Sequence, residues 1–207
     1  MTLGILGGTF DPVHDGHLIA AAAAKRTLSL DRVLLLPSRT PPHRPAEPRA
    51  SVYHRFAMAA LAAAEHDVIV SDLELRRDGP SYTARTLEAF HSEGYQPSQL
   101  YFITGSDAFA EVETWFDYPR LLTLANFVVV SRPGAPPPSR LIPNPRSPIP
   151  GVPTLIAVEA ETMDVSSTDI RRRVGAGEPI DGLVPASVAG HIRRHGLYVP
   201  APVAAVL

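Results

Sequence analysis

Two histidines and a pair of glycines stand close together just after the first apolar run of the chain. Gly7 and Gly8 end that run, and His14 and His17 follow on the same short loop. Glycines at the end of a buried strand let backbone N–H groups approach a phosphate, and imidazoles at the start of the next helix can meet the same anion. The spacing predicts a phosphate-handling loop that carries two imidazoles.

The residues alone leave other interpretations of this loop open. The glycine pair can serve only a tight strand-to-helix turn, with the histidines solvated or capping the helix. Zinc binding is disfavoured because the chain has no cysteine, no HExxH sequence and no obvious third ligand. A redox dinucleotide is disfavoured as well, because neither GxxxxGK[ST] nor a GxGxxG spacing with its acidic partner is present. No metal held by the protein itself is expected.

Hydroxyl groups and a guanidinium gather a second time near the carboxyl end. Ser167 and Thr168 stand where a helix is expected to start, and Arg171 follows within its first turn. Free N–H groups, hydroxyls and a guanidinium at one point suit a polyphosphate. The same residues also fit a helix cap followed by a solvated basic face at 171–173. When this segment is considered together with the histidine loop, phosphate binding is the favoured interpretation.

Two further helix starts could hold the rest of a nucleotide. Segment 72–83 has the pattern of a strand, a turn and a capped helix start at Ser81 or Thr83, whose free amides could take a carboxylate. After another apolar run, Gly105 makes a turn and Asp107 stands where it could accept from a ribose hydroxyl. Both starts are predicted to face a ligand.

Two features fit both a structural and a ligand-binding role. Trp115, the only tryptophan, suits either the core or a stacking face for a flat ring. The proline-rich stretch 37–48 carries Arg39, His43 and Arg44, so it is either a lid over an anion or a solvated loop.

The elements that must position these groups follow from the alternation of short apolar runs with helical patterns. This alternation predicts a doubly wound α/β fold, Rossmann-like, with a mostly parallel sheet. Ligands bind such sheets at the carboxyl ends of the strands, where every motif above falls. The proline-rich segment 133–153 is expected to be a structural loop. Strands are expected at 3–6, 33–36, 68–70, 100–104, 127–130 and 155–158, and helices at about 17–29, 51–65, 83–91, 108–112, 120–124, 168–174 and 186–195.

Composition sets the limits of the interpretation. The 207 residues predict one domain over 1–207, of which about 165–200 form a small helical carboxyl-terminal part. The net charge is −2, from 19 basic and 21 acidic residues, which gives no reason to expect nucleic-acid or membrane binding. Without cysteine there is no thiol nucleophile, and without a targeting or spanning segment a cytoplasmic protein is expected. The oligomeric state stays open.

Taken together, the motifs resemble the bacterial nicotinate-nucleotide adenylyltransferases, a family of the H-x-G-H nucleotidyltransferase superfamily. H-x-G-H alone marks only the superfamily, whereas the PPH, GPSYT, D-to-W and SSTxIR elements in this order are specific. The resemblance covers nearly the whole chain. The matching segments are GGTFDPVHDGH at 7–17, LPSRTPPHR at 36–44, YHRFAMAAL at 53–61, DLELRRDGPSYT at 72–83, ITGSDAF with Trp115 at 103–115, VVVSRPG at 128–134, and VSSTDIR with LVPASVAGHIRRHGLY at 165–198.

The resemblance implies an enzyme that joins nicotinate mononucleotide to the AMP part of ATP, releasing pyrophosphate and forming nicotinate adenine dinucleotide, the step before amidation to NAD. In-line attack on the α-phosphorus needs alignment and positive charge but no covalent nucleophile. His17 is assigned to the α-phosphate and His14 to neighbouring ATP phosphates, with Arg171 as the third catalytic residue. Mg²⁺ is expected to arrive with ATP.

The expected site has an ATP half and a mononucleotide half. Ser167, Thr168 and Arg171 are assigned to the β- and γ-phosphates. The backbone N–H groups near Thr83 are expected to favour nicotinate mononucleotide, the acid, over nicotinamide mononucleotide, the amide. ATP is expected to contact Gly7, Gly8, Thr9, Phe10, His14, His17, Gly105, Asp107, Ser167, Thr168 and Arg171. Nicotinate mononucleotide is expected to contact Thr9, Arg44, Ser81, Tyr82, Thr83, Trp115 and Phe116.

Four positions depart from the family pattern. Arg44 replaces the usual lysine, and Arg85 stands where an acidic or amide residue is common, which leaves the role of that side chain open. Val165 and His191 replace residues that are more often Ile and Tyr.

The sequence leaves other functions open. They are an adenylyltransferase for nicotinamide mononucleotide, for both mononucleotides or for phosphopantetheine, and a nucleotide-binding sensor without turnover.

Overall fold

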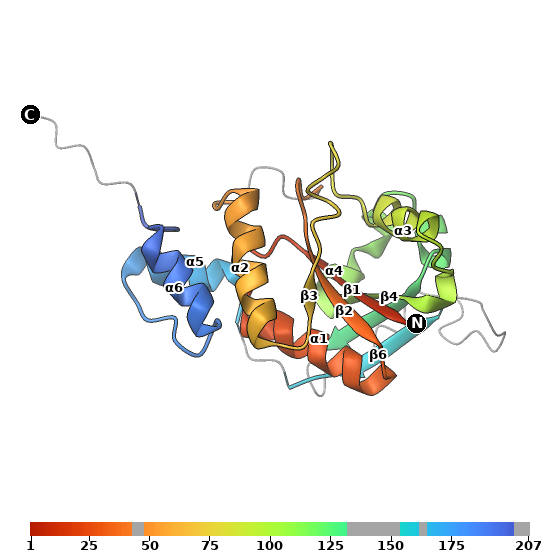
Figure 1. Ribbon diagram of the computed structural model, residues 1–207, viewed down its shortest axis with the longest axis horizontal. Coiled ribbons are helices and arrows are strands. Elements are labelled where there is room, and N and C mark those ends of the chain that lie inside the picture. The colour runs from red at the N-terminus through yellow and green to blue at the C-terminus, as the bar shows by residue number, and fades with distance from the viewer. Residues whose placement is uncertain (43–47, 132–153, 162–164, 201–207) are drawn as a thin grey trace, which may run out of the picture.

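The computed structural model describes residues 1–42, 48–131, 154–161 and 165–200. Within them, six strands form one sheet in the order β3-β2-β1-β4-β5-β6, and every neighbouring pair is parallel (Figure 1). This order runs outward in both directions from β1, as in doubly wound folds, so the predicted fold class is confirmed. The strands are β1 (Leu3–Gly8), β2 (Arg32–Pro37), β3 (Ile69–Val70), β4 (Leu100–Gly105), β5 (Asn126–Ser131) and β6 (Leu155–Glu159).

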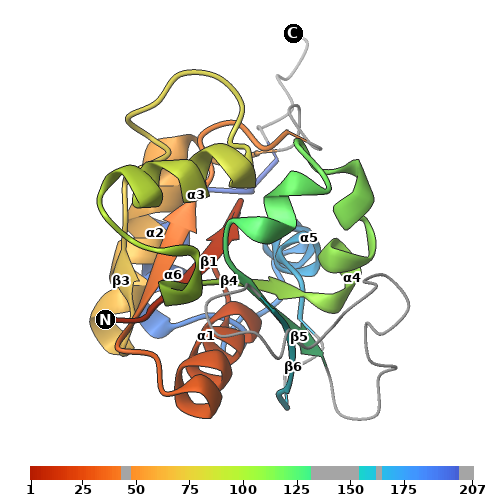
Figure 2. The same cartoon turned by 90° about the vertical axis from the view of Figure 1, so that its right-hand side faces the viewer.

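Helices cover both faces of the sheet, because successive strand residues point to opposite sides. Figure 2 shows helices on both sides of the sheet. Leu6 packs in one buried cluster with residues of α1 and α2, whereas Ile5 packs in the other with residues of α3 and α4. The helices are α1 (Asp15–Leu28), α2 (Val52–Glu65), α3 (Thr83–Ser92), α4 (Ser106–Ala110), α5 (Ser167–Ala176) and α6 (Ala186–Arg194), with 3₁₀ helices η1 (Pro97–Gln99), η2 (Val112–Thr114) and η3 (Arg120–Thr123).

All six strands lie where the sequence predicts them, and the longer helices agree to within two residues at each end. The prediction differs where elements are short. The expected helix at 120–124 is the 3₁₀ helix η3, and the one near 108–112 divides into α4 and η2. The strand expected at the start of segment 72–83 is wrong, because the Leu75 N–H donates to the Asp72 carbonyl oxygen at 2.9 Å and closes a turn.

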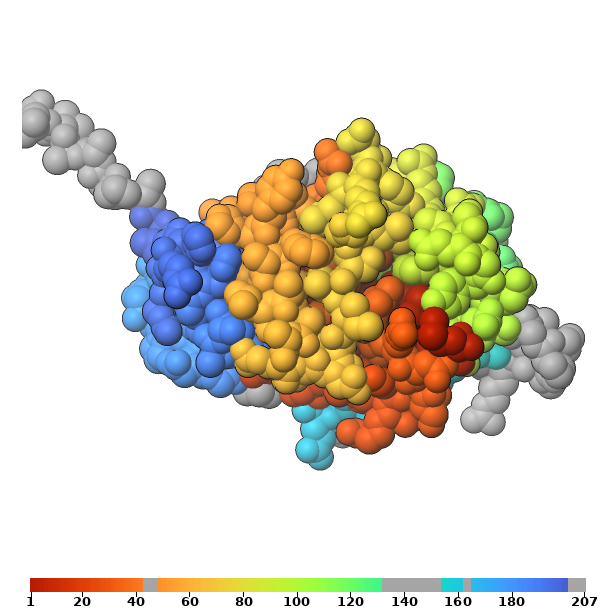
Figure 3. Space-filling model, viewed as in Figure 1, coloured from red at the N-terminus to blue at the C-terminus, as the bar shows by residue number. Residues whose placement is uncertain are grey.

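The carboxyl-terminal helices α5 and α6 pack against the rest of the chain, beside α2 (Figure 3). Ile170 of α5 and Ile192 of α6 belong to the same buried cluster as Leu18 of α1 and Met58 of α2. The Asp15 N–H donates to the Leu183 carbonyl oxygen at 3.0 Å, which joins the start of α1 to this part. No helix in the described part of the chain is long and apolar enough to cross a membrane.

Candidate active site

A cavity of about 590 Å³ opens at the carboxyl ends of β1 and β4, between the starts of α1, α3, α4 and α5. This is the edge at which doubly wound sheets bind ligands. Its lining brings together segments that are far apart in the sequence. The lining residues include Gly7, Gly8, Thr9, Phe10, Asp11, His14, His17, Ser38, Glu74, Ser81, Tyr82, Thr83, Thr104, Asp107, Glu111, Trp115, Phe116, Ser167, Thr168 and Arg171.

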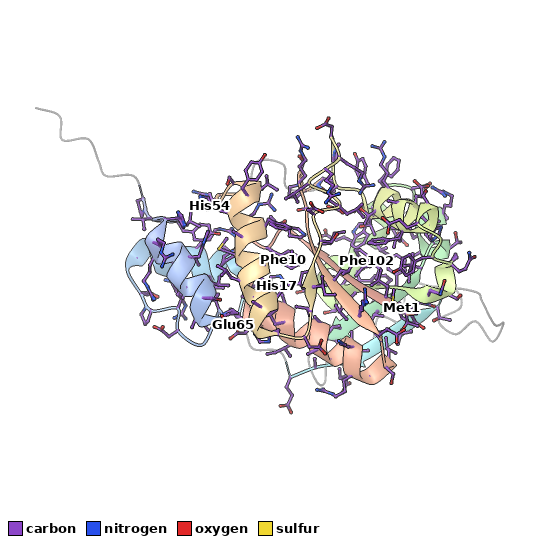
Figure 4. All side chains as sticks on the ribbon, viewed as in Figure 1. Met1, Phe10, His17, His54, Glu65 and Phe102 are labelled. Carbon is purple, nitrogen blue, oxygen red and sulfur yellow. The ribbon has the colours of Figure 1, made fainter. Side chains whose placement is uncertain are left out.

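The glycine pair is required by close packing of aromatic rings over the backbone. A Cβ at position 7 would lie 3.2 Å from the Phe102 ring, and one at position 8 would lie 3.0 Å from the Phe10 ring. Both distances are shorter than ordinary carbon contacts. The Phe10 ring is itself buried and meets His17 edge-on at 4.9 Å between ring centres (Figure 4). The missing side chains at positions 7 and 8 therefore make room for these rings, and both glycines line the cavity.

The two histidines of the loop are stacked on each other, with ring centres 3.7 Å apart. His14 is the N-cap residue of α1, with an extended backbone, and its N–H donates to Nδ1 of His17 at 3.2 Å. Because Nδ1 of His17 accepts, the neutral ring carries its proton on Nε2. That N–H is free of this contact and can donate to a ligand.

Burial keeps both imidazoles neutral at physiological pH. Loss of solvation lowers the pKa of His14 to about 4. The pKa of His17 is also well below its ordinary value, first because of burial and then because of the charge that His14 would carry. Nδ1 of His14 is buried and has no hydrogen-bond partner among the described residues. The loop thus presents neutral N–H donors rather than fixed cations.

Asp11 lies on the same loop and holds it in place. Its carboxylate accepts from the backbone N–H groups of Arg49 at 2.8 Å and Ala50 at 3.1 Å. It also accepts from the hydroxyl of Tyr198 at 2.8 Å. Burial and the charge of Asp11 raise the pKa of Tyr198, so this hydroxyl keeps its proton. Since both oxygens of Asp11 are engaged, this carboxylate ties the loop to the segment just before α2 and to the carboxyl-terminal part.

The start of α5 lies directly against the same loop. The Ser167 hydroxyl donates to the Pro12 carbonyl oxygen at 2.8 Å. The guanidinium of Arg171 donates to the Asp11 carbonyl oxygen at 2.8 Å and to the Thr168 hydroxyl at 3.2 Å. These bonds hold the hydroxyls and the guanidinium beside the histidine loop.

The other interpretation of this segment, a helix cap followed by a solvated basic face, is correct for Ser166, Arg172 and Arg173. Ser166 is the N-cap and accepts from the Asp169 N–H at 3.1 Å. Arg172 and Arg173 pair with Asp169, and Arg172 also pairs with Glu178. Of the three arginines in the run, Arg171 lines the cavity and the next two belong to the outer face.

Arg55 of α2 lies beneath the cavity-lining loops that follow β1 and β2 and bonds to their backbone. Its side chain is 1% exposed, and its guanidinium donates to the carbonyl oxygens of Thr9 at 2.7 Å, Ser38 at 2.7 Å and Arg39 at 3.2 Å. The loops after β1 and β2 are thereby fixed to one buried cation. No side-chain pattern in the sequence predicts this role, because the acceptors are backbone groups.

The start of α3 corrects one prediction. Its N-cap is Tyr82, without a side-chain hydrogen bond, and not Ser81 or Thr83. The Ser81 hydroxyl accepts instead from the Arg39 N–H at 2.9 Å, so it links the loop after β2 to α3. The guanidinium of Arg39 is engaged too, with the Leu75 and Arg77 carbonyl oxygens and with Asp78.

Aromatic rings form the wall near α3. Tyr82 stacks on Phe116 with ring centres 4.4 Å apart and planes inclined by 21°. Trp115 meets Phe102 edge-on at 6.0 Å while it also lines the cavity, so its two proposed roles are compatible. Glu74 is buried and accepts from the Thr86 hydroxyl at 2.6 Å, and burial raises its pKa.

The cavity lining does not account for every predicted site residue. Gly105 is the N-cap of α4 and is not among the cavity-lining residues. Arg44 and His43 lie outside the described residues, as does the 133–153 segment. Sequence reasoning missed Asp11 and Glu74, whose partners become neighbours only when the chain has folded.

Comparisons with known proteins agree on one family. A sequence model of the Cytidylyltransferase-like family matches residues 5–173. A relative from Roseiflexus sp. (strain RS-1), named "Probable nicotinate-nucleotide adenylyltransferase", is 46% identical over 198 residues, which cover 95% of this chain and 97% of that protein. The chain belongs to the nicotinate-nucleotide adenylyltransferase family. A second relative with the same name, from Desulfitobacterium hafniense (strain Y51), is 42% identical over 95% of both chains.

Solved structures agree with the fold of this adenylyltransferase family. The nicotinic acid mononucleotide adenylyltransferase of Plasmodium falciparum, complexed with NaAD, superposes with a TM-score of 0.73 at 16% identity, over 95% of this chain and 97% of that one. The complex of the same protein with APC gives a TM-score of 0.71 over 95% and 96%. At this identity the likeness concerns the fold.

Proposed function

We propose that this chain transfers the AMP moiety of ATP to nicotinate mononucleotide in the cavity described above, forming nicotinate adenine dinucleotide and pyrophosphate for NAD biosynthesis. One observation carries the assignment of roles. The stacked histidines of the first loop and the Ser167–Arg171 helix start border a single cavity, with an aromatic wall on its α3 side. Such a cavity suits a polyphosphate and a flat ring together.

The reaction needs alignment and charge stabilisation. An oxygen of the mononucleotide phosphate attacks the α-phosphorus, the new P–O bond forms, and the bond to the β-phosphate oxygen breaks as pyrophosphate leaves. His17 donates from Nε2 to a non-bridging oxygen of the α-phosphate, where negative charge builds up. His14 donates to a neighbouring ATP phosphate. Preorganised donors of this kind act mainly on the transition state.

The β- and γ-phosphates are assigned to Ser167, Thr168 and Arg171. The α5 amino end adds free backbone N–H groups and the positive end of its dipole. Gly7, Gly8, Thr9 and Phe10 line the cavity, and we assign them to the place where the two substrates meet. Asp107, which lines the same cavity, is assigned to the ATP ribose.

A divalent cation fits this site as a companion of ATP. Among the described residues, no cluster of three His, Cys, Asp or Glu side chains could hold a metal ion, and both oxygens of Asp11 are already engaged. Mg²⁺ binds few protein ligands, keeps several waters and coordinates phosphates. We assign Mg²⁺ to the ATP phosphates, whose charge it would neutralise.

Nicotinate mononucleotide is assigned to the α3 side of the cavity. The backbone N–H groups in the first turn of α3, from Thr83 onward, suit the carboxylate of the pyridine ring, with Ser81 and Tyr82 beside them. The Tyr82 N–H itself already donates to the Pro80 carbonyl oxygen at 3.0 Å. Trp115 and Phe116 supply flat faces for the ring. Arg44 is proposed for the mononucleotide phosphate on the resemblance alone, since it lies outside the described residues.

We further propose that residues 1–207 act as one domain in the cytoplasm. The buried cluster that α5 and α6 share with α1 and α2 supports a single folding unit. The carboxyl-terminal part then serves to carry the polyphosphate-binding helix start to the histidine loop.

The test is His17→Ala, measured as pyrophosphate release with ATP and nicotinate mononucleotide. Loss of one transition-state donor should lower kcat by about 100- to 1,000-fold while ATP affinity changes far less. The exposed His66→Ala is the matched control and should leave turnover unchanged. A His17→Ala enzyme that kept more than about a third of wild-type kcat would remove His17 from this role.

A further inference from the structure

Arg85 occupies a position that helix stability does not explain. It is the third residue of α3, and its side chain is exposed. The amino end of a helix is the positive end of its dipole, so an acidic side chain there is stabilising and a cation is not. A charge placed against the dipole, beside a proposed anion site, points to a role in ligand binding.

The guanidinium lies beside the aromatic wall of the cavity. Its Cζ is 5.4 Å from the centre of the Tyr82 ring and also 5.4 Å from the centre of the Phe116 ring. These rings stack on each other and come from two different segments, the start of α3 and the turn after η2. This is within the range of cation–π contacts, so the Arg85 guanidinium lies against the stacked pair where the two segments meet.

Arginines pair with two of the carboxylates near this wall. Glu88, one turn further along α3, is paired with Arg120. Asp78, in the turn before α3, is paired with Arg39. Arg77 is close as well, because its guanidinium donates to the Arg85 carbonyl oxygen at 2.8 Å. Glu88 and Asp78 therefore each have an arginine partner, although Glu88 shares Arg120 with Asp117. The nearest other carboxylate is the buried Glu74, which accepts from Thr86.

We propose that Arg85 is a specificity-determining residue, which positions the Tyr82–Phe116 pair and adds positive charge that favours a pyridine carboxylate over a carboxamide. This inference rests on the proposed function, since it takes the α3 side of the cavity as the pyridine site. Tyr82 and Phe116 line that cavity. The helix amides alone would give a preference for the acid, and Arg85 increases it.

The experiment compares nicotinate and nicotinamide mononucleotides with wild type, Arg85→Gln and Arg85→Lys at saturating ATP. Losing one partly screened charge near the carboxylate should reduce the acid-to-amide ratio of kcat/KM by about five- to tenfold in Arg85→Gln. The change should appear in the KM for the acid, with kcat and the KM for ATP unchanged. Arg85→Lys keeps the charge and should retain most of the ratio. Raising the salt concentration should erode the ratio of the wild type but not that of Arg85→Gln.

Arg26→Gln is the matched control, because it removes the same charge from the last turn of α1. An Arg85→Gln ratio equal to that of wild type would overturn the inference, as would an equal fall in Arg26→Gln. Equal weakening of both mononucleotides would also overturn it, because Arg85 would then only stabilise the stacked rings. Calorimetric affinities for the two mononucleotides, with a non-hydrolysable ATP analogue bound, keep the test independent of turnover. A wild type that binds both mononucleotides without turning them over would contradict the proposed function and still give the binding ratio that tests Arg85.

Discussion

Replacing Arg55 by Met tests whether one buried cation holds the loops that carry the site. The change removes three donated hydrogen bonds, to the carbonyl oxygens of Thr9, Ser38 and Arg39. Bonds from a charged donor contribute about 1.5–3 kcal/mol each, or about 5–9 kcal/mol together. Arg55 is 1% exposed, so its charge carries a desolvation cost in the folded chain. Removing the charge removes this cost, which offsets several kcal/mol of the loss. A net loss of about 4 kcal/mol in the free energy of unfolding is expected, a large share of the stability of a typical domain.

Urea unfolding measures this loss, with the wild-type slope as the check that the denatured state is unchanged. Arg55→Lys keeps the charge with fewer donors, and it should lose about half as much. The exposed Arg26→Met should change stability by less than about 0.5 kcal/mol. If Arg55→Met lost less than about 1 kcal/mol, the guanidinium would not be what fixes these loops.

Two further predictions concern charge in the site. The pKa of His14 is lowered to about 4 in the folded chain, so the unfolded chain binds this proton first as the pH falls below about 6.5. Its burial should therefore cost stability progressively between about pH 6.5 and pH 4, up to about 3 kcal/mol, and His14→Gln should flatten that part of a stability–pH curve. Arg171→Ala should raise the KM for ATP about tenfold or more, whereas Arg172→Ala, which removes a charge from the outer face of the same helix, should leave it unchanged. Equal KM values for ATP in the two arginine variants would exclude Arg171 from the polyphosphate site.

The sheet could be predicted from the sequence because each strand is a short apolar run between helical patterns. β1 and β4 show this clearly, since both are buried along most of their length and end in glycine. The place of the site followed from the same pattern, because parallel strands bring their carboxyl ends to one edge. The histidine loop and the Ser167–Arg171 segment were expected at that edge, and the folded chain brings both to one cavity.

What could not be predicted depends on contacts between distant segments. The bond from Tyr198 to Asp11 joins residues 187 apart in the sequence, and no local pattern indicates it. Ser81 was expected to cap α3, yet its hydroxyl bonds to the Arg39 backbone, because the folded chain offers that donor. The roles of individual residues toward ATP and the mononucleotide remain predictions.

The central claim is that both substrates meet in one cavity and that AMP passes directly to the nicotinate mononucleotide. Wild type, incubated with ATP, Mg²⁺ and either mononucleotide, should release pyrophosphate and form dinucleotide in equal amounts, with kcat/KM at least about a hundredfold higher for the acid. His17→Ala should lose both products together. Pyrophosphate release without dinucleotide, or equal efficiency with acid and amide, would contradict this account of the site.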